Sequence, residues 1–149
     1  MIERFNLRVY GLVCNEKSEI LLFSERRNGF QMLKFPGGGV EYGEGIIDAL
    51  KREFKEELDT EIQRAEFFYF NEEFQKSSFQ KSDQLVAFYY LVDVDHAAIS
   101  ILPKTPLDAT DPSDFEQASW HPLSEIASAD LTFPVDRKVL EKFLSLKTT

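Results

Sequence analysis

The sequence is short of the features that mark secreted and membrane-bound chains. Its 149 residues include one cysteine, Cys14, whose place in an apolar run favours a buried thiol over a nucleophile. One cysteine cannot form an internal disulfide, which suits a reducing compartment. No apolar run approaches the roughly 18 residues that mark a membrane helix, and the first residues are not a basic segment leading into an apolar one. We therefore expect a soluble, cytoplasmic protein with no membrane partner.

Positive charge is also scarce. The chain has 26 acidic and 17 basic residues, a formal net charge of −9. Nucleic-acid backbones and anionic membranes are bound by clustered Lys and Arg, so this balance argues against nucleic acid as the main partner. A phosphorylated small molecule remains compatible with the charge if a metal ion screens it.

An amphipathic helix is predicted over residues 46–58. Leu50, Phe54 and Leu58 follow one another at helical spacing, so their arc should face the core. A neighbouring arc carries three carboxylates, which are Glu53, Glu56 and Glu57. Glu53 and Glu57 stand four residues apart, and their repulsion should cost a few tenths of a kcal/mol.

No lysine of this helix lies on the acidic arc to offset the repulsion, because Lys51 and Lys55 point elsewhere. A divalent cation is the economical compensation, since Mg²⁺ is typically held by a few carboxylates together with substrate phosphates. The alternative is an acidic helix face exposed to solvent. A glycine-rich stretch at residues 37–45, just before the helix, favours the cation, because glycine lets the backbone approach a ligand closely.

The spacing of these residues resembles the signature box of the Nudix hydrolases, of the MutT-like kind. Gly38 is followed after five residues by Glu44, and after seven more by the sequence Arg-Glu-Phe-Lys-Glu-Glu at residues 52–57. The end of the box departs from the family pattern, because Asp59 and Thr60 replace the usual glycine and aliphatic residue. Asp tolerates the left-handed conformation that ends such a helix, at a cost of roughly 1 kcal/mol.

The resemblance implies roles for the residues of the box. Glu53, Glu56 and Glu57 would hold Mg²⁺ or Mn²⁺, with the carbonyl of Gly37 or Gly38 as a further ligand. Arg52 stands one residue before Glu53 and four before Glu56, so this spacing lets it orient a carboxylate rather than act on the substrate.

The general base is left open by the sequence. It is Glu53 by the family pattern, or one of three acids near the end of the chain, which are Asp111, Asp114 and Glu116. Glu116 is preferred among these three, because it is nearest a predicted strand and shortly precedes a tryptophan, as in a common Nudix ending. Three residues are candidates for substrate binding, namely Arg26, Arg27 and Glu44.

The remaining chain predicts alternating strands and helices. Strands are expected at residues 7–14, 19–26, 31–35, 61–70, 84–95 and 115–121, and helices at 122–126 and 135–146. We expect the first two strands to form a hairpin, the near-continuous apolar run at 20–23 to be buried on both faces, and the strand at 84–95 to be central. Three prolines should break regular structure at 99–113.

This order predicts an α/β fold, an α/β/α sandwich with a mixed sheet and a loop-helix-loop catalytic box, in one domain over residues 1–149. The Nudix resemblance implies the same architecture, and it raises a homodimer as a further expectation. Phe74 and Phe79, in a polar loop, are candidates for stacking on a nucleobase.

The predicted function is metal-dependent hydrolysis of a diphosphate linkage in a nucleoside diphosphate joined to another moiety, as in an NTP, ADP-ribose or a nucleotide sugar. Two alternatives stay open. One is a hydrolase of non-nucleotide diphosphates, and the other is a catalytically silent nucleotide-binding or regulatory module of the same fold.

Overall fold

The chain alternates strands with two α-helices, as the sequence predicts. The structure is a computed structural model that describes residues 1–106 and 108–147. Its elements are β1 (Arg4–Leu12), β2 (Glu19–Arg27), β3 (Phe30–Lys34), β4 (Gly37–Gly39), α1 (Ile46–Leu58), β5 (Ile62–Phe70), β6 (Asp83–Val94), the 3₁₀ turn η1 (His96–Ala98), β7 (Phe115–Pro122), η2 (Ser128–Asp130) and α2 (Pro134–Lys147). Leu107, within the proline-rich stretch expected to be irregular, lies outside the described residues.

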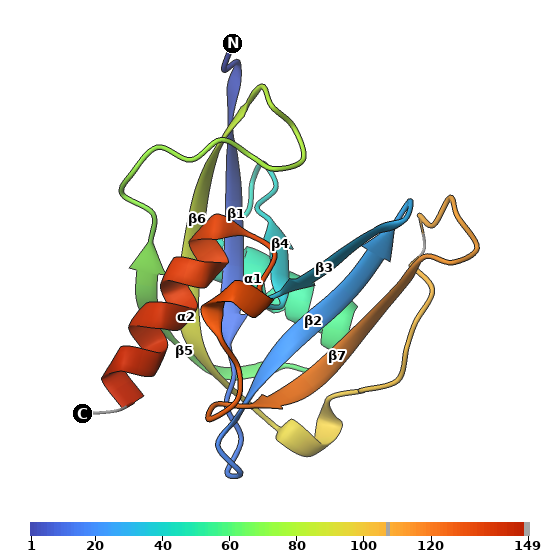
Figure 1. Ribbon diagram of the computed structural model, residues 1–149, viewed down its shortest axis with the longest axis vertical. Coiled ribbons are helices and arrows are strands. Elements are labelled where there is room, and N and C mark those ends of the chain that lie inside the picture. The colour runs from blue at the N-terminus through green and yellow to red at the C-terminus, as the bar shows by residue number, and fades with distance from the viewer. Residues whose placement is uncertain (107, 148–149) are drawn as a thin grey trace.

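The strands form two sheets. A four-stranded mixed sheet has the order β4-β1-β6-β5, in which β1 and β6 run parallel and the other pairs antiparallel. A three-stranded antiparallel sheet has the order β3-β2-β7. Helix α2 lies in front of the sheets and α1 behind them (Figure 1). The predicted α/β/α sandwich is confirmed, and β6 occupies the interior position expected of the strand at 84–95.

Strand β2 separates two hydrophobic cores, and this explains its unbroken apolar run. Leu21 and Phe23 pack in the cluster that contains α1, whereas Ile20 and Leu22 pack in the cluster that contains α2. All four side chains are fully buried. The predicted burial of this strand on both faces is therefore confirmed.

The predicted hairpin between the first two strands is wrong beyond its turn. The Asn15 amide donates to the Glu19 carbonyl and the Leu21 amide to the Val13 carbonyl, so the strands pair only briefly. They then separate, since β1 pairs with β6 and β2 pairs with β7. Because both faces of β2 are apolar, its place between two cores buries more hydrophobic surface than an edge position would.

The helix predicted at residues 122–126 is also wrong. Pro122 still belongs to β7, where it pairs with Glu19, and its carbonyl accepts from the amides of Glu125 and Ile126. The chain therefore makes one turn that does not continue. The final helix is confirmed, but Asp136, which the sequence places off its apolar face, is buried among the core residues.

Helix α1 begins and ends where the sequence predicts. Gly45 precedes it in an extended conformation, and its amide donates to the Asp48 carboxylate over 3.3 Å. Asp59 ends the helix in the left-handed region, with φ 51° and ψ 39°, and its amide donates to the Lys55 carbonyl. The departure from the usual glycine is accommodated because Asp adopts this conformation.

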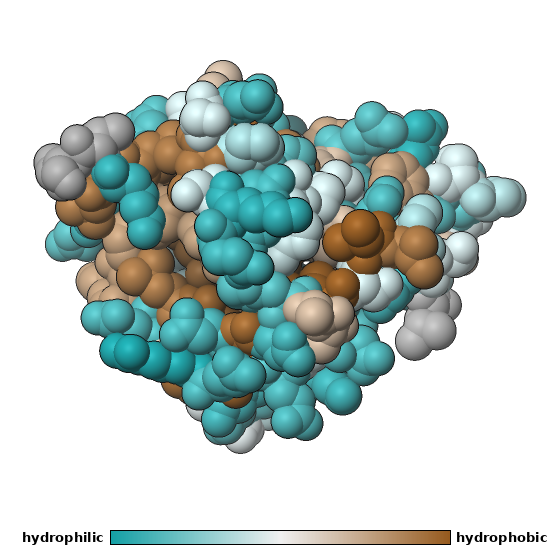
Figure 2. Space-filling view, turned by 90° about the horizontal axis from the view of Figure 1, so that it is seen from below, coloured by the Kyte–Doolittle hydropathy of each residue, from teal (hydrophilic) through white to brown (hydrophobic). Residues whose placement is uncertain are grey.

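The surface is mixed in character. On the face seen from below, hydrophilic side chains surround several separate hydrophobic patches (Figure 2). Among the described residues, no helix has both the length and the apolar character needed to cross a membrane.

Replacing Asp59 with Gly should stabilise the protein, because glycine adopts a positive φ without strain from a Cβ atom. We expect about 1 kcal/mol in the free energy of unfolding, measured as a shift of the urea midpoint. Asp59→Ala is the matched control, because both variants lose the ion pair between Asp59 and Lys55. A midpoint for Asp59→Gly at or below that of Asp59→Ala would contradict the left-handed helix end.

Candidate active site

The glycine-rich stretch brings backbone against the acidic side of α1. Residues 37–39 form strand β4, paired with β1, where the sequence predicts a loop. Gly37 has φ +142°, and a Cβ atom there would collide with the Val9 carbonyl. A Cβ atom on Gly38 would lie 2.5 Å from the Glu53 carboxyl carbon. The absence of side chains at these two positions is therefore what admits both the strand pairing and the Glu53 carboxylate.

Arg52 is the centre of the polar network. Its guanidinium donates to both oxygens of Glu44, over 2.7 and 2.8 Å, and to Glu53 over 3.0 Å. It also reaches Glu56, over 3.3 Å, and the Gly39 carbonyl, over 2.9 Å. The sequence placed Arg52 as an orienting residue, and its contacts here are all of that kind.

These contacts shift the acidity of the groups that Arg52 touches. Its hydrogen bonds lower the pKa of Glu44 to about 2, which keeps that carboxylate charged. Glu44 in turn raises the pKa of Arg52. The predicted substrate-binding residue Glu44 therefore lies beside Arg52, and it links the chain just before α1 to the helix itself.

Glu57 is the most perturbed acid of the box. Burial raises the pKa of its carboxyl to about 8, although the positive charge of Lys34 and the Gly37 amide, which donates to Oε1 over 2.8 Å, both oppose the shift. Burial also raises the pKa of Glu53, and Arg52 counteracts it. Burial thus removes water from both carboxyl groups, so a nearby positive charge stabilises their ionised forms.

A cation does offset the acidic arc, although it is neither of the two lysines of the helix. Arg52 bridges Glu53, at 3.0 Å, and Glu56, at 3.3 Å, in agreement with the orienting role that the sequence gave it. The Glu56 side chain is 58% exposed. Within the described ranges, no group of three or more acidic, His or Cys side chains is already arranged to hold a metal ion.

A buried lysine adds a second cation. Lys34, on β3, lies 3.2 Å from Glu25 on β2, and its charge acts on Glu57. Sequence reasoning missed Lys34, Glu25 and also Arg8, whose charge acts on Glu53 and Glu57. The sequence did contain one indication of the role of Lys34. It is a charged residue that interrupts an apolar stretch, directly before Phe35 and Pro36.

The three candidate acids near β7 have different surroundings. Asp114 is buried and accepts from the Asn28 amide, whereas Asp111 accepts from Ser113 in its own turn. Glu116 lies opposite Glu25 in the β2–β7 pairing, and burial raises its pKa. The preferred residue, Glu116, is thus the one that shares the charge network of Lys34 and Glu25.

The predicted phosphate-binding arginines lie at the far end of β2. Arg27 is engaged by acids, at 2.6 Å from Asp108, 3.2 Å from Glu25 and 3.8 Å from Glu116. For Arg26, the Nε atom is buried without a hydrogen-bond partner in the described part of the chain. The structure therefore joins Arg27 to the acid network around Glu25 and Glu116.

The donor set suits a divalent cation. Glu53, Glu56 and Glu57 offer hard oxygen ligands, and the desolvated Glu57 carboxyl has only one hydrogen-bond donor, the Gly37 amide, among the residues described. Because Gly38 has no side chain, the Glu53 carboxylate can lie directly against it. Charge and ligand type therefore fit Mg²⁺ or Mn²⁺.

Comparison with known proteins shows which chains this one is similar to. The chain is 37% identical, over 86 residues, to an 8-oxo-dGTP diphosphatase of Haemophilus influenzae, and the match covers 56% of this chain and 59% of that relative. The chain thus spans less than two thirds of that relative's length.

Solved structures share the fold. A Nudix hydrolase from Nitrosomonas europaea has a TM-score of 0.70 and 20% identity, covering 96% of this chain and 90% of that one. A MutT Nudix hydrolase from Burkholderia pseudomallei has a TM-score of 0.63 and 24% identity, covering 93% and 97%. The family model described as the NUDIX domain matches residues 4–143. The chain therefore belongs to the Nudix hydrolase family.

Proposed function

We propose that this hydrolase cleaves a diphosphate linkage in a nucleoside diphosphate joined to another group, with Mg²⁺ or Mn²⁺ as cofactor. The observation that carries the proposal is the set of three box carboxylates, held beside the side-chain-free strand β4 by Arg52 and the Gly37 amide. We also propose that residues 1–149 form one Nudix domain, since the family model spans most of them.

Glu53, Glu56 and Glu57 would hold the cation, with the carbonyl of Gly37 or Gly38 as a further ligand. When bound, the cation would neutralise phosphate oxygens and make an attacking water more acidic. The reaction breaks one phosphorus–oxygen bond of the anhydride and forms another to the water oxygen, giving two phosphorylated products.

The residues of this chain would supply positioning and proton transfer. Arg52 would fix Glu53 against Gly38, because it donates to Glu53 and to the Gly39 carbonyl from the same guanidinium. We propose Glu53 as the acceptor of the water proton, since burial raises its pKa toward that of an effective base. Glu116, in the neighbouring charge network of Glu25 and Lys34, would be the alternative proton acceptor.

The substrate class is proposed from the relative and from the charge of the site. The Haemophilus relative is named for 8-oxo-dGTP, so an oxidised guanine nucleoside triphosphate is the first compound to test here. Because the chain has a net charge of −9, it should bind a nucleotide whose phosphates are screened by a metal ion more readily than a nucleotide without the metal.

Removal of the metal should abolish turnover. We expect phosphate-product release from at least one member of a panel of NTPs, 8-oxo-dGTP, ADP-ribose, nucleotide sugars and dinucleoside polyphosphates with Mg²⁺, and none with EDTA. Added Mg²⁺ in excess should restore the rate. Turnover that persists in EDTA would refute the metal-dependent proposal, and metal binding without cleavage of any panel member would redirect it to non-nucleotide diphosphates.

Glu57→Gln should lower kcat by about 10³-fold or more while leaving the fold intact, because it removes a negative charge from the proposed cation site. Calorimetric titration with Mg²⁺ should show the loss of affinity directly. Glu72→Gln is the control, since Glu72 is an exposed acid of the loop after β5. An unchanged rate in Glu57→Gln would rule out its proposed role.

The proton acceptor is tested by comparing two isosteric variants. Glu53→Gln should lower kcat by about 10²–10⁴-fold, the usual contribution of a general base, and Glu116→Gln should lower it less. Steady-state kinetics with saturating Mg²⁺ measure both. The reverse order would assign the proton transfer to Glu116.

A further inference from the structure

Strand β5 forms a free edge of the four-stranded sheet. It pairs with β6 on one side, and no strand in the described part of the chain pairs with its other side. Figure 1 shows β5 at the outside of the sheet, at the opposite end of the strand order from β4. A free edge presents a row of unpaired backbone N–H and C=O groups. The outer edge of β5 is therefore a surface on which another strand can pair.

The composition of β5 does little to prevent such pairing. Its nine residues include no proline and no lysine, and its charged residues are Arg64 and Glu66. Two β-bulges interrupt its pairing with β6, one before and one after residues 64–67. Bulges of this kind twist an edge away from a neighbour, but between them residues 64–67 pair regularly. This regular part is where a further strand can add to the sheet.

Aromatic side chains lie beside this edge, on the face of the sheet that carries α1. Phe67 is 50% exposed and Phe70 is 42% exposed. Between centroids, the ring of Phe67 lies 6.1 Å from that of Phe70 and 5.7 Å from that of Tyr90 on β6, and Phe70 stacks on Phe88 at 6.2 Å. Four adjoining rings, two of them about half exposed, are typical of an interaction surface.

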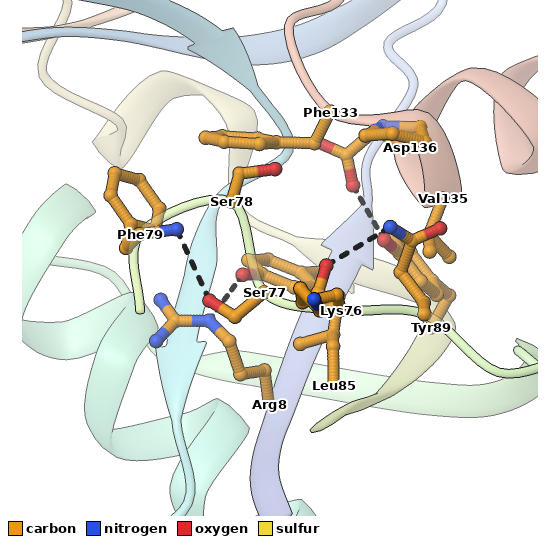
Figure 3. Close-up of a pocket in the computed structure, with 13 residues that line it drawn as sticks. Arg8, Lys76, Ser77, Ser78, Phe79, Leu85, Tyr89, Phe133, Val135 and Asp136 are labelled. Atoms are coloured by element: carbon orange, nitrogen blue, oxygen red, sulfur yellow. Dashed lines mark hydrogen bonds between the residues drawn. The ribbon is translucent and has the colours of Figure 1, made fainter. Parts of the chain in front are cut away.

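The opposite face of the sheet is already covered by α2. Leu85 and Tyr89 of β6 lie near the start of α2, where the Tyr89 hydroxyl donates to the Asp136 carboxylate (Figure 3). From β5 itself, the ring of Phe68 packs against that of Phe143 of α2, with 6.0 Å between centroids. A strand that adds to β5 therefore finds its apolar contacts on the face that carries α1.

The two charges of β5 match those of a second copy of the same strand. Arg64 and Glu66 flank Ala65, are both exposed, and line the hollow beside Phe143 on the α2 face. Neither has an ion-pair partner in residues 1–106 and 108–147. If two copies of β5 pair antiparallel about a two-fold axis at Ala65, Arg64 lies opposite the partner's Glu66, and Glu66 opposite the partner's Arg64. Each copy thus supplies the charge that the other lacks.

This register is the one that pairs the charges. Residues opposite each other in an antiparallel pair point to the same face, so the two-fold axis passes through a residue and not between two residues. Moving the axis by one residue, to Arg64 or to Glu66, would place two arginines or two glutamates opposite each other. Like charges directly opposite destabilise a sheet. The charge order of β5 therefore selects Ala65 as the centre.

We propose that the chain forms a symmetric dimer in which β5 pairs antiparallel with β5 of a second copy, centred on Ala65. The two four-stranded sheets then form one continuous sheet. Phe67 lies diagonal to the partner's Ala65 on the face that carries α1, so the dimer covers part of its exposed ring. Strand β4, which carries Gly37 and Gly38, is at the other edge of the sheet, so both copies of the box stay outside the interface.

Light scattering coupled to size-exclusion chromatography of the full-length protein tests the dimer. We expect the mass to rise from that of one chain toward that of two as the concentration increases from about 1 to about 300 µM, because a single strand pair with a few aromatic rings is a small interface. Sedimentation velocity then gives the dissociation constant. The mass of one chain at every concentration would overturn the proposal.

Reversing the charges one at a time tests the register. Arg64→Glu and Glu66→Arg should each raise the dissociation constant at least about 10-fold, because symmetry turns two ion pairs into two repulsions. The double variant that carries both changes should dimerise again, since opposite charges face each other once more. Glu72→Arg, at an exposed acid after β5, is the matched control for Glu66→Arg and should leave the dissociation constant unchanged.

Two results would place the interface elsewhere and overturn the proposal. One is a dimer that neither single reversal weakens, and the other is a double variant that dimerises no better than the single variants. Phe67→Ala should also weaken the dimer, because it removes an aromatic ring from the interface. Thermal unfolding shows whether each variant is folded, and if Phe67→Ala is not, the exposed charge variants decide. Since these experiments measure mass and not turnover, their result is independent of the proposed hydrolysis.

Discussion

The guanidinium of Arg52 is the contact on which the candidate site depends. It ties the segment before α1 through Glu44, the strand β4 through the Gly39 carbonyl, and α1 itself through Glu53 and Glu56. A planar guanidinium presents several donors in fixed directions, so one side chain can set three backbone segments relative to one another. Without it, Glu53 and Glu56 would lose the positive charge that bridges them.

The acidic centre is balanced by cations from three different strands and helices. Arg52 comes from α1, Lys34 from β3 and Arg8 from β1, and each acts on Glu53 or Glu57. These positive charges offset part of the repulsion between the carboxylates. The pKa of Glu57 is still raised, mainly because its carboxyl is buried.

Local patterns in the sequence predicted α1, its ends and the box, because these depend on spacing along one segment. Residues 46–58 and the acids at 53, 56 and 57 needed no knowledge of tertiary structure. Lys34 and Asp136 were beyond such reasoning, since their importance arises from neighbours on other elements, Glu25 and Tyr89. The hairpin prediction failed for the same reason, because the partners of β1 and β2 are strands far along the chain.

The separation of β1 and β2 after their turn gives the molecule the shape of a wedge. The two sheets are joined at the turn of residues 15–18 and spread apart away from it (Figure 1). Lys34 and Glu116 belong to one sheet, whereas β4 and Arg8 belong to the other. The opening angle of the wedge therefore sets how far apart the two halves of the charge network stand. A small rotation of one sheet relative to the other about this turn would change all the distances across the site together.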